Sequence, residues 1–134
     1  MATFVFELVS PERLICSKPV VMVTAPGYNG EYGVLAGHAP LVTELKPGVI
    51  GIYEKDDHSP ASRIFVSGGF AEVSQEKFTI LARDALDVSE IKKEEILSEI
   101  KSLAERIRNV DTEEELEKLE AESTILTAKL QAVA

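Results

Sequence analysis

The chain contains two histidines and one cysteine, the residue types that most often act as general bases, nucleophiles or metal ligands. His38 lies in a Gly-His-Ala-Pro loop, and His58 lies in a polar turn. One cysteine and two isolated histidines cannot build the usual zinc site, which needs a cluster of ligands. No Gly-x-Ser-x-Gly elbow and no phosphate-binding Gly-x-x-x-x-Gly-Lys loop occurs. The sequence therefore predicts no metal, no cofactor and no catalytic residue.

His38 is the one residue for which a catalytic role can be written. Glu31 or Glu44 would orient it as a general base, because residues of neighbouring loops can converge. A structural role, or contact with a partner protein, is the better explanation of a single histidine in a loop. We favour these alternatives, and the sequence does not indicate an enzyme.

Glycines are frequent between residues 26 and 40, where four of them are spaced 3, 3 and 4 residues apart. This spacing is too irregular for a dinucleotide-binding fingerprint, and no helical pattern follows it. We interpret the segment as a run of tight turns that need positive φ angles.

The elements that position these residues change type near Ala85. Before it, apolar residues alternate or form short runs between Gly, Pro and Asn turn signals, which predicts an antiparallel sandwich or flattened barrel. The predicted strands cover residues 3–10, 19–26, 41–45, 49–53, 63–67, 70–74 and 77–82.

After Ser89 the chain has no glycine and no proline, and apolar residues recur every three or four positions. This is the narrow seam of two helices packed side by side. Thr112 and Glu115 form a capping box that starts the second helix, while Asp87 and Ser89 are expected to cap the first. The seam positions are Ile96, Ile100, Leu103, Ile107 and Val110, then Leu116, Leu119, Ser123, Leu126, Leu130 and Val133.

The predicted fold class is therefore α+β: an N-terminal antiparallel β-sandwich, residues 1–86, followed by a C-terminal antiparallel two-helix hairpin, residues 87–134. So short a seam buries little area and makes the hairpin marginal by itself. The hairpin either packs permanently on the sandwich or docks in more than one way, and composition leaves both open.

Bulk properties exclude several classes of function. The net charge of −9 argues against a nucleic-acid binder and against electrostatic binding to anionic lipid. No run of about 18 apolar residues is present to insert in a bilayer. The chain opens directly into a strand pattern without a signal or transit segment, and Cys16 has no partner for a disulfide. We expect a reducing, cytoplasmic location.

Three motifs, in order, resemble the ε subunits of F-type ATP synthases. The first is Gly-Glu-Tyr-Gly-Val-Leu-Ala-Gly-His-Ala-Pro-Leu at residues 30–41. The second is Leu-Lys-Pro-Gly-Val-Ile at residues 45–50, and the third is Phe-Val-Ser-Gly-Gly-Phe-Ala-Glu-Val at residues 65–73. The opening Glu-Leu-Val-Ser-Pro-Glu at residues 7–12 also fits. The resemblance covers residues 3 to about 87, and the tail matches in architecture more than in sequence.

The resemblance implies a β-sandwich with a two-helix tail and a non-catalytic role in the rotor. In that family the sandwich binds the foot of the γ stalk and rests on the c-ring, which couples proton translocation to ATP synthesis. By this resemblance Glu31 and His38 are partner-binding residues. The implied location is the cytoplasmic face of the bacterial inner membrane, peripheral through the complex. The implied contacts include γ, the c-ring and a transient one with the β subunit.

The tail departs from the family in its charge. Many relatives extend the hairpin along γ and inhibit ATP hydrolysis with basic residues set against an acidic segment of β. Here the chain from residue 111 onward is net −5, so we expect weak inhibition or none. The seven acids are Asp111, Glu113, Glu114, Glu115, Glu117, Glu120 and Glu122, and the two bases are Lys118 and Lys129.

The junction between the two halves also departs from relatives that bind ATP through an (Ile/Leu)-Asp-x-x-Arg-Ala motif. Residues 86–91 read Leu-Asp-Val-Ser-Glu-Ile, so Glu90 stands in the place of the arginine. A carboxylate repels a phosphate, and we expect no useful ATP affinity.

Three functions stay under comparison. The first is a rotor subunit that joins γ to the c-ring, and the second is a brake whose hairpin extends to inhibit hydrolysis. The third is a free-standing sandwich that binds a small ligand in an apolar pocket. The absence of Trp and the presence of only three Tyr argue against the third. The sequence does not identify the organism, the coupling ion or the affinity for γ.

Overall fold

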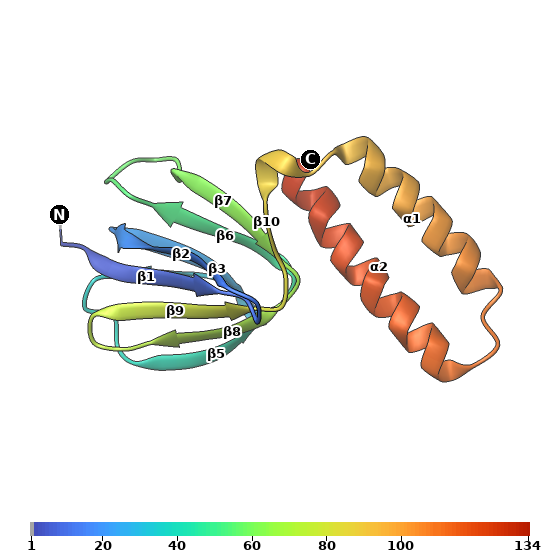
Figure 1. Cartoon of the computed structure of the whole chain (residues 1–134), viewed down its shortest axis with the longest axis horizontal. Helices are drawn as coiled ribbons and strands as arrows, with labels where there is room; N and C mark the ends of the chain where they lie inside the picture. The colour runs from blue at the N-terminus through green and yellow to red at the C-terminus, as the bar shows by residue number, and fades with distance from the viewer. Residues whose placement is uncertain (1) are drawn as a thin grey trace. The chain divides into compact units, whose positions relative to one another are not determined.

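Ten short strands and two long helices make up the part of the chain that the structure describes, residues 2–134 of a computed structural model (Figure 1). The described residues up to Asp87 form one compact unit and Val88–Ala134 form a second. The strands are β1 (Phe4–Val9), β2 (Leu14–Val20), β3 (Met22–Gly27), β4 (Gly30–Leu35), β5 (Leu41–Leu45), β6 (Gly48–Tyr53), β7 (Ser62–Val66), β8 (Gly69–Val73), β9 (Lys77–Ala82) and β10 (Ala85–Asp87).

The strands form one continuous sheet in the order β10-β7-β6-β3-β5-β8-β9-β1-β2, with β4 paired to β3. The sheet folds over on itself as a β-sandwich, so that one set of alternate side chains faces inward. The pairs are antiparallel except β1 with β9, which run parallel. The predicted sandwich is confirmed, and the parallel pair is the one departure from its antiparallel character.

The core of the sandwich follows from strict alternation along the strands. In β1 every second residue is buried, and its Phe6 ring lies 5.8 Å from the Phe78 ring of β9, centroid to centroid. Fully buried aliphatic residues from β3 and β6, such as Val23 and Ile52, belong to the same core cluster. Because the side-chain period of a strand is two, this pattern fixes which residues face outward as well.

Three strands were missed in the sequence. β2 was missed because Pro19 lies within it and its alternation is weak, and an edge strand tolerates proline. The predicted strand 19–26 is therefore wrong as one element, because the chain passes from β2 to β3 at Val21. β10 has only three residues, too few for a pattern.

β4 was missed because it lies in the segment interpreted as a run of tight turns. That interpretation holds for Gly30 and Gly37, which have φ angles of 124° and 80°. It is wrong for Gly27 and Gly33, which lie in the paired strands β3 and β4. In this hairpin, small residues serve close packing as well as turning: a Cβ at Gly27 would lie 2.9 Å from the Gly30 carbonyl oxygen.

The second unit is a helical hairpin made of α1 (Lys93–Arg108) and α2 (Glu113–Val133), preceded by a short 3₁₀ turn, Val88–Glu90. The Thr112 hydroxyl accepts a hydrogen bond from the Glu115 backbone N–H at 3.2 Å, as the capping box predicts. The expected capping of α1 by Asp87 and Ser89 is wrong. Helix α1 begins later, with Lys92 at its N-cap and no side-chain cap, because the 3₁₀ turn intervenes.

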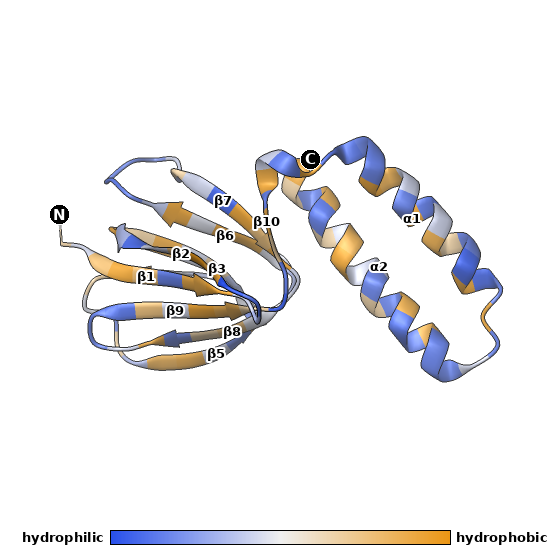
Figure 2. Ribbon diagram, viewed as in Figure 1, coloured by the Kyte–Doolittle hydropathy of each residue, from blue (hydrophilic) through white to orange (hydrophobic). Residues whose placement is uncertain are grey.

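The seam predicted for the hairpin is observed, and it is thin. Ile96, Leu103 and Leu119 are buried, whereas Ser123 and most other seam residues are half-buried. Figure 2 shows α1 as a largely hydrophilic ribbon with narrow hydrophobic bands, and α2 as alternating hydrophilic and hydrophobic bands. Neither helix has a stretch long and apolar enough to cross a membrane.

Candidate partner-binding surface

The residues that could do chemistry lie apart within residues 2–134. No three His, Cys, Asp or Glu side chains there are grouped so that they could hold a metal ion. Cys16 is half-buried, and burial raises the pKa of its thiol, with Lys18 opposing and Glu54 reinforcing the change. A thiol with a raised pKa stays protonated at neutral pH and is a poor nucleophile.

His38 lies just after β4 and is fixed by the local backbone. Its N–H donates to the Leu35 carbonyl at 3.2 Å, and its ring Nδ1 lies 2.8 Å from the Ala39 carbonyl. A carbonyl oxygen only accepts, so this contact requires the proton on Nδ1. The half-buried ring lines a small cavity beside Phe4 and the β8–β9 turn. No contact with Glu31 or Glu44 orients His38 as a base among its described hydrogen bonds.

Glu31 is exposed at the start of β4, next to the two-residue turn that joins β3 to β4. Tyr28 in this turn is 62 % exposed. Behind the turn lies an open cavity of about 480 Å³, which Tyr32 and Thr43 also line. Their hydroxyl oxygens are 2.6 Å apart and hydrogen-bonded, which ties β4 to β5. Exposed aromatic residues are enriched in protein-contact surfaces.

Glu31 and His38 do not come together. Glu31 lies at one end of β4 and His38 follows its other end. Glu31 and Leu35 alone are separated by about 13 Å at the usual rise of a strand. These two residues can contact one extended partner surface or two different partners, but they cannot form one small site.

A third feature, which sequence reasoning missed, is an apolar patch on the outer side of the sheet. Phe70 of β8 pairs with Leu81 of β9, and Leu81 pairs with Val9 of β1. Phe70 is 52 % exposed, Leu81 55 % and Val42 of β5 72 %. We call these four residues, Val9, Val42, Phe70 and Leu81, the apolar face.

A groove of about 280 Å³ is lined by Val9, Phe70 and Leu81 of the apolar face, together with Arg83, and almost entirely by apolar atoms. Large apolar residues that stay exposed side by side are characteristic of protein interfaces. The sequence carried a signal for this face. Phe70 and Leu81 stand at the outward phase of their strands, where the alternation calls for polar residues.

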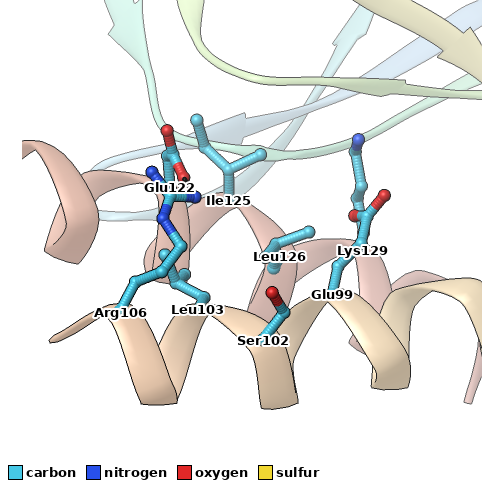
Figure 3. Close-up of a pocket in the computed structure, with 8 residues that line it drawn as sticks. All are labelled: Glu99, Ser102, Leu103, Arg106, Glu122, Ile125, Leu126 and Lys129. Carbon is cyan, nitrogen blue, oxygen red and sulfur yellow. Dashed lines mark ion pairs between the residues drawn. The ribbon is translucent and has the colours of Figure 1, made fainter. Parts of the chain in front are cut away.

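The helical hairpin has a groove of its own, about 330 Å³ in volume, between α1 and α2 (Figure 3). Leu103 and Leu126 lie between two charged ends of the groove. Arg106 at one end pairs with Glu122 at 3.6 Å, while Glu99 and Lys129 lie at the other end. The two basic and two acidic residues balance, so the groove has no excess of positive charge.

Comparison with known proteins identifies relatives of the chain. Residues 3–88 match the family model described as the beta-sandwich domain of the ATP synthase delta/epsilon chain. The chain is 41 % identical over 132 residues to the ATP synthase epsilon chain of Rhodospirillum centenum, covering 96 % of this chain and 90 % of that one. It is 39 % identical over 127 residues to the epsilon chain of Rhodospirillum rubrum, with coverage of 95 % and 93 %.

Solved structures agree with the fold. A chain in the mitochondrial ATP synthase of Euglena gracilis, solved as an OSCP/F1/c-ring assembly, superposes with a TM-score of 0.87 at 25 % identity. It covers 100 % of this chain and 83 % of the other. A chain in the central stalk and c-ring of the Tetrahymena thermophila enzyme has the same fold, with a TM-score of 0.68 at 13 % identity and coverage of 97 % and 96 %.

Proposed function

The chain belongs to the ATP synthase epsilon chain family, and on that premise we propose that it is a non-catalytic subunit of the central stalk. In this role it joins the γ subunit to the c-ring and so couples proton translocation to ATP synthesis. It acts at the cytoplasmic face of the bacterial inner membrane, held there through the complex and not by inserting into lipid.

The apolar face is the observation that carries this proposal. A rotor subunit transmits torque through a protein interface, which must be specific and must not slip. Specific interfaces bury on the order of 1,200 Å² or more and have an apolar centre. The adjacent residues Phe70 and Leu81 provide such a centre on the sheet, and we assign it to γ.

Glu31 and His38 are proposed as further partner-binding residues. Glu31 borders the exposed turn that carries Tyr28, and a polar, protruding turn suits the polar loops of the c-ring. His38 lies at the far end of β4 and is assigned to γ. The separation of the two residues along β4 is compatible with contacts to two partners.

The helical hairpin is proposed to inhibit ATP hydrolysis weakly or not at all. The part of the chain from residue 111 onward is net −5. An acidic helix repels an acidic segment of the β subunit, and like charges that meet across an interface lower affinity. The alternative function is a brake in which the hairpin extends along γ. Its half-buried, thin seam favours that alternative, since such a hairpin opens easily.

The deciding experiment is ATP hydrolysis by the matching catalytic core, stripped of this subunit and titrated with the full chain or with residues 1–87. We expect both proteins to bind and neither to lower the rate severalfold. Inhibition by the full chain alone would establish the brake and refute the charge argument. If neither protein binds the core, the rotor proposal fails.

A further inference from the structure

Ser67 is the one buried polar residue among residues 2–134, with 6 % of its surface exposed. Its hydroxyl donates to Asp84 Oδ2 at 3.0 Å, and its backbone N–H lies 3.4 Å from the Asp84 carbonyl. The Arg83 N–H also donates to the Gly68 carbonyl, at 3.2 Å. Three hydrogen bonds therefore join the β7–β8 turn to the two residues that connect β9 to β10.

The backbones of β8 and β9 are closely packed next to this turn. A Cβ atom at Gly69 would lie 2.2 Å from the Leu81 carbonyl oxygen, so the start of β8 and the end of β9 are in direct backbone contact. This contact holds the β7–β8 turn against the β9–β10 connection. Strand pairing therefore brings Ser67 next to Asp84.

Asp84 immediately precedes β10, the shortest strand of the sheet. Its three residues pair with β7 at the end of the strand order, from Ala85 opposite Val66 to Asp87 opposite Ile64. A three-residue edge strand has few ladder hydrogen bonds and opens locally at low free-energy cost. After β10 the chain passes through the 3₁₀ turn to α1 and the helical hairpin.

We propose that the hydrogen bond between Ser67 and Asp84 keeps β10 paired with β7 and thereby sets how readily the connecting segment, residues 85–92, opens. Ser67 acts through Asp84 and is a positioning residue for the chain that leads to the hairpin. A hydroxyl that donates to a carboxylate makes one of the stronger hydrogen bonds in proteins. The inference rests on contacts inside the sandwich, so it does not depend on the proposed function.

Hydrogen exchange of the full-length chain tests the proposal. Ser67→Ala and Asp84→Ala each remove the hydrogen bond and are expected to raise the exchange rate of amides 85–87 about tenfold. Core amides of β1 and β9 are expected to keep their rates. Asp84→Asn restores slow exchange, because its amide oxygen still accepts from the Ser67 hydroxyl. In the double variant Ser67→Ala/Asp84→Ala the effects should not add, since both changes remove the same interaction.

Limited trypsin digestion gives a second readout, since Lys92 and Lys93 stand at the end of the connecting segment. Cleavage there is expected to accelerate by a factor similar to that for exchange. Thr43→Val is the matched control, because it removes the Tyr32–Thr43 hydrogen bond elsewhere in the sandwich. It should leave both readouts at residues 85–92 unchanged.

The proposal is overturned if Ser67→Ala and Asp84→Ala leave amides 85–87 as protected as in the unmodified chain. It is also overturned if all strands exchange faster together, because the hydrogen bond then stabilises the whole sandwich and not the connection. A loss of protection in Asp84→Asn equal to that in Asp84→Ala would show that the negative charge matters and the hydrogen bond does not. Circular dichroism checks that each variant is folded. Asp84 is exposed, so Asp84→Ala removes the hydrogen bond without changing the buried Ser67.

Discussion

At the scale of single residues, outward-facing positions decide what the sandwich can bind. The core residues of β8 and β9 explain the fold, whereas Phe70 and Leu81 contribute nothing to the core cluster and remain half-exposed. Large exposed apolar side chains lower the solubility of a protein. A partner that buries the Phe70 and Leu81 side chains gains the favourable free energy of removing them from water.

Phe70→Ser is expected to lower the affinity for γ about tenfold or more, because burying a large aromatic side chain contributes roughly 1.5–3 kcal/mol. Leu97→Ser is the control, since Leu97 is similarly exposed (46 %) and lies on α1, outside the apolar face and the sandwich. Titration of labelled chain with γ measures both. Equal losses of affinity for γ in the two variants would show that the apolar face is not part of the interface.

Glu31→Lys and His38→Ala are expected to weaken assembly independently. The residues lie at opposite ends of β4, and substitutions more than about 10 Å apart without shared partners usually have additive free energies. Binding of the single and double variants to the γ–c-ring subcomplex measures the sum. Strong non-additivity would show that both side chains contact one compact site. Wild-type affinity in both variants would exclude them as partner-binding residues.

Gly27→Ala is expected to destabilise the sandwich by about 1–3 kcal/mol, because the new methyl group has no space. It would lie 2.9 Å from the Gly30 oxygen and 3.0 Å from the Tyr32 ring. Gly33→Ala in the same hairpin is the control, since its Cβ would meet only the Met22 sulfur at 3.6 Å. Urea denaturation compares the two free energies of unfolding. If Gly33→Ala costs as much as Gly27→Ala, close packing does not explain Gly27.

At the scale of elements, the two helices depend on each other because each has only a narrow apolar seam. α2 begins at a side-chain cap, whereas α1 begins without one. Since short helices are marginal in water, such local contributions count for more in this hairpin than in the sandwich.

Thr112→Ala is expected to cost about 1 kcal/mol of helix stability, because it leaves the Glu115 N–H without its side-chain acceptor. Thr124→Ala is a control in the same helix. The Thr124 hydroxyl donates back to the Glu120 carbonyl, a contact that adds little to helix stability. Hydrogen exchange at the first turn of α2 compares the variants, and the prediction fails if both change it equally.

At the scale of the whole molecule, charge decides which ligands the chain accepts. The net charge is −9, and in the hairpin groove Arg106 pairs with Glu122 at 3.6 Å. A triphosphate would have to displace Glu122 from Arg106 and approach the acidic second helix, which is electrostatically costly.

ATP is therefore expected not to bind the chain at micromolar concentration. Equilibrium dialysis of the full chain with ATP and magnesium measures this directly. If acidic side chains are what repels ATP, a variant in which Glu90 and Glu122 are both replaced by glutamine should bind ATP at least as well as the unmodified chain. A micromolar dissociation constant for the unmodified chain would refute the charge argument.

The amino-acid sequence by itself determined the fold class, the change from strands to helices near Ala85, and the cap at Thr112. These are local properties, because alternation, helical spacing and capping depend on residues a few positions apart. It also identified the family, through motifs that include His38 and the glycines around it.

Only the tertiary structure decided which residues share a surface. It separated Glu31 from His38, paired Phe70 with Leu81 and Leu81 with Val9, and brought Ser67 to Asp84 across 17 positions of sequence. It also showed Gly30–Leu35 to be a strand. The physical reason is that strand register depends on pairing between distant segments, and a period-two pattern tells which way a residue faces but not which residue lies beside it.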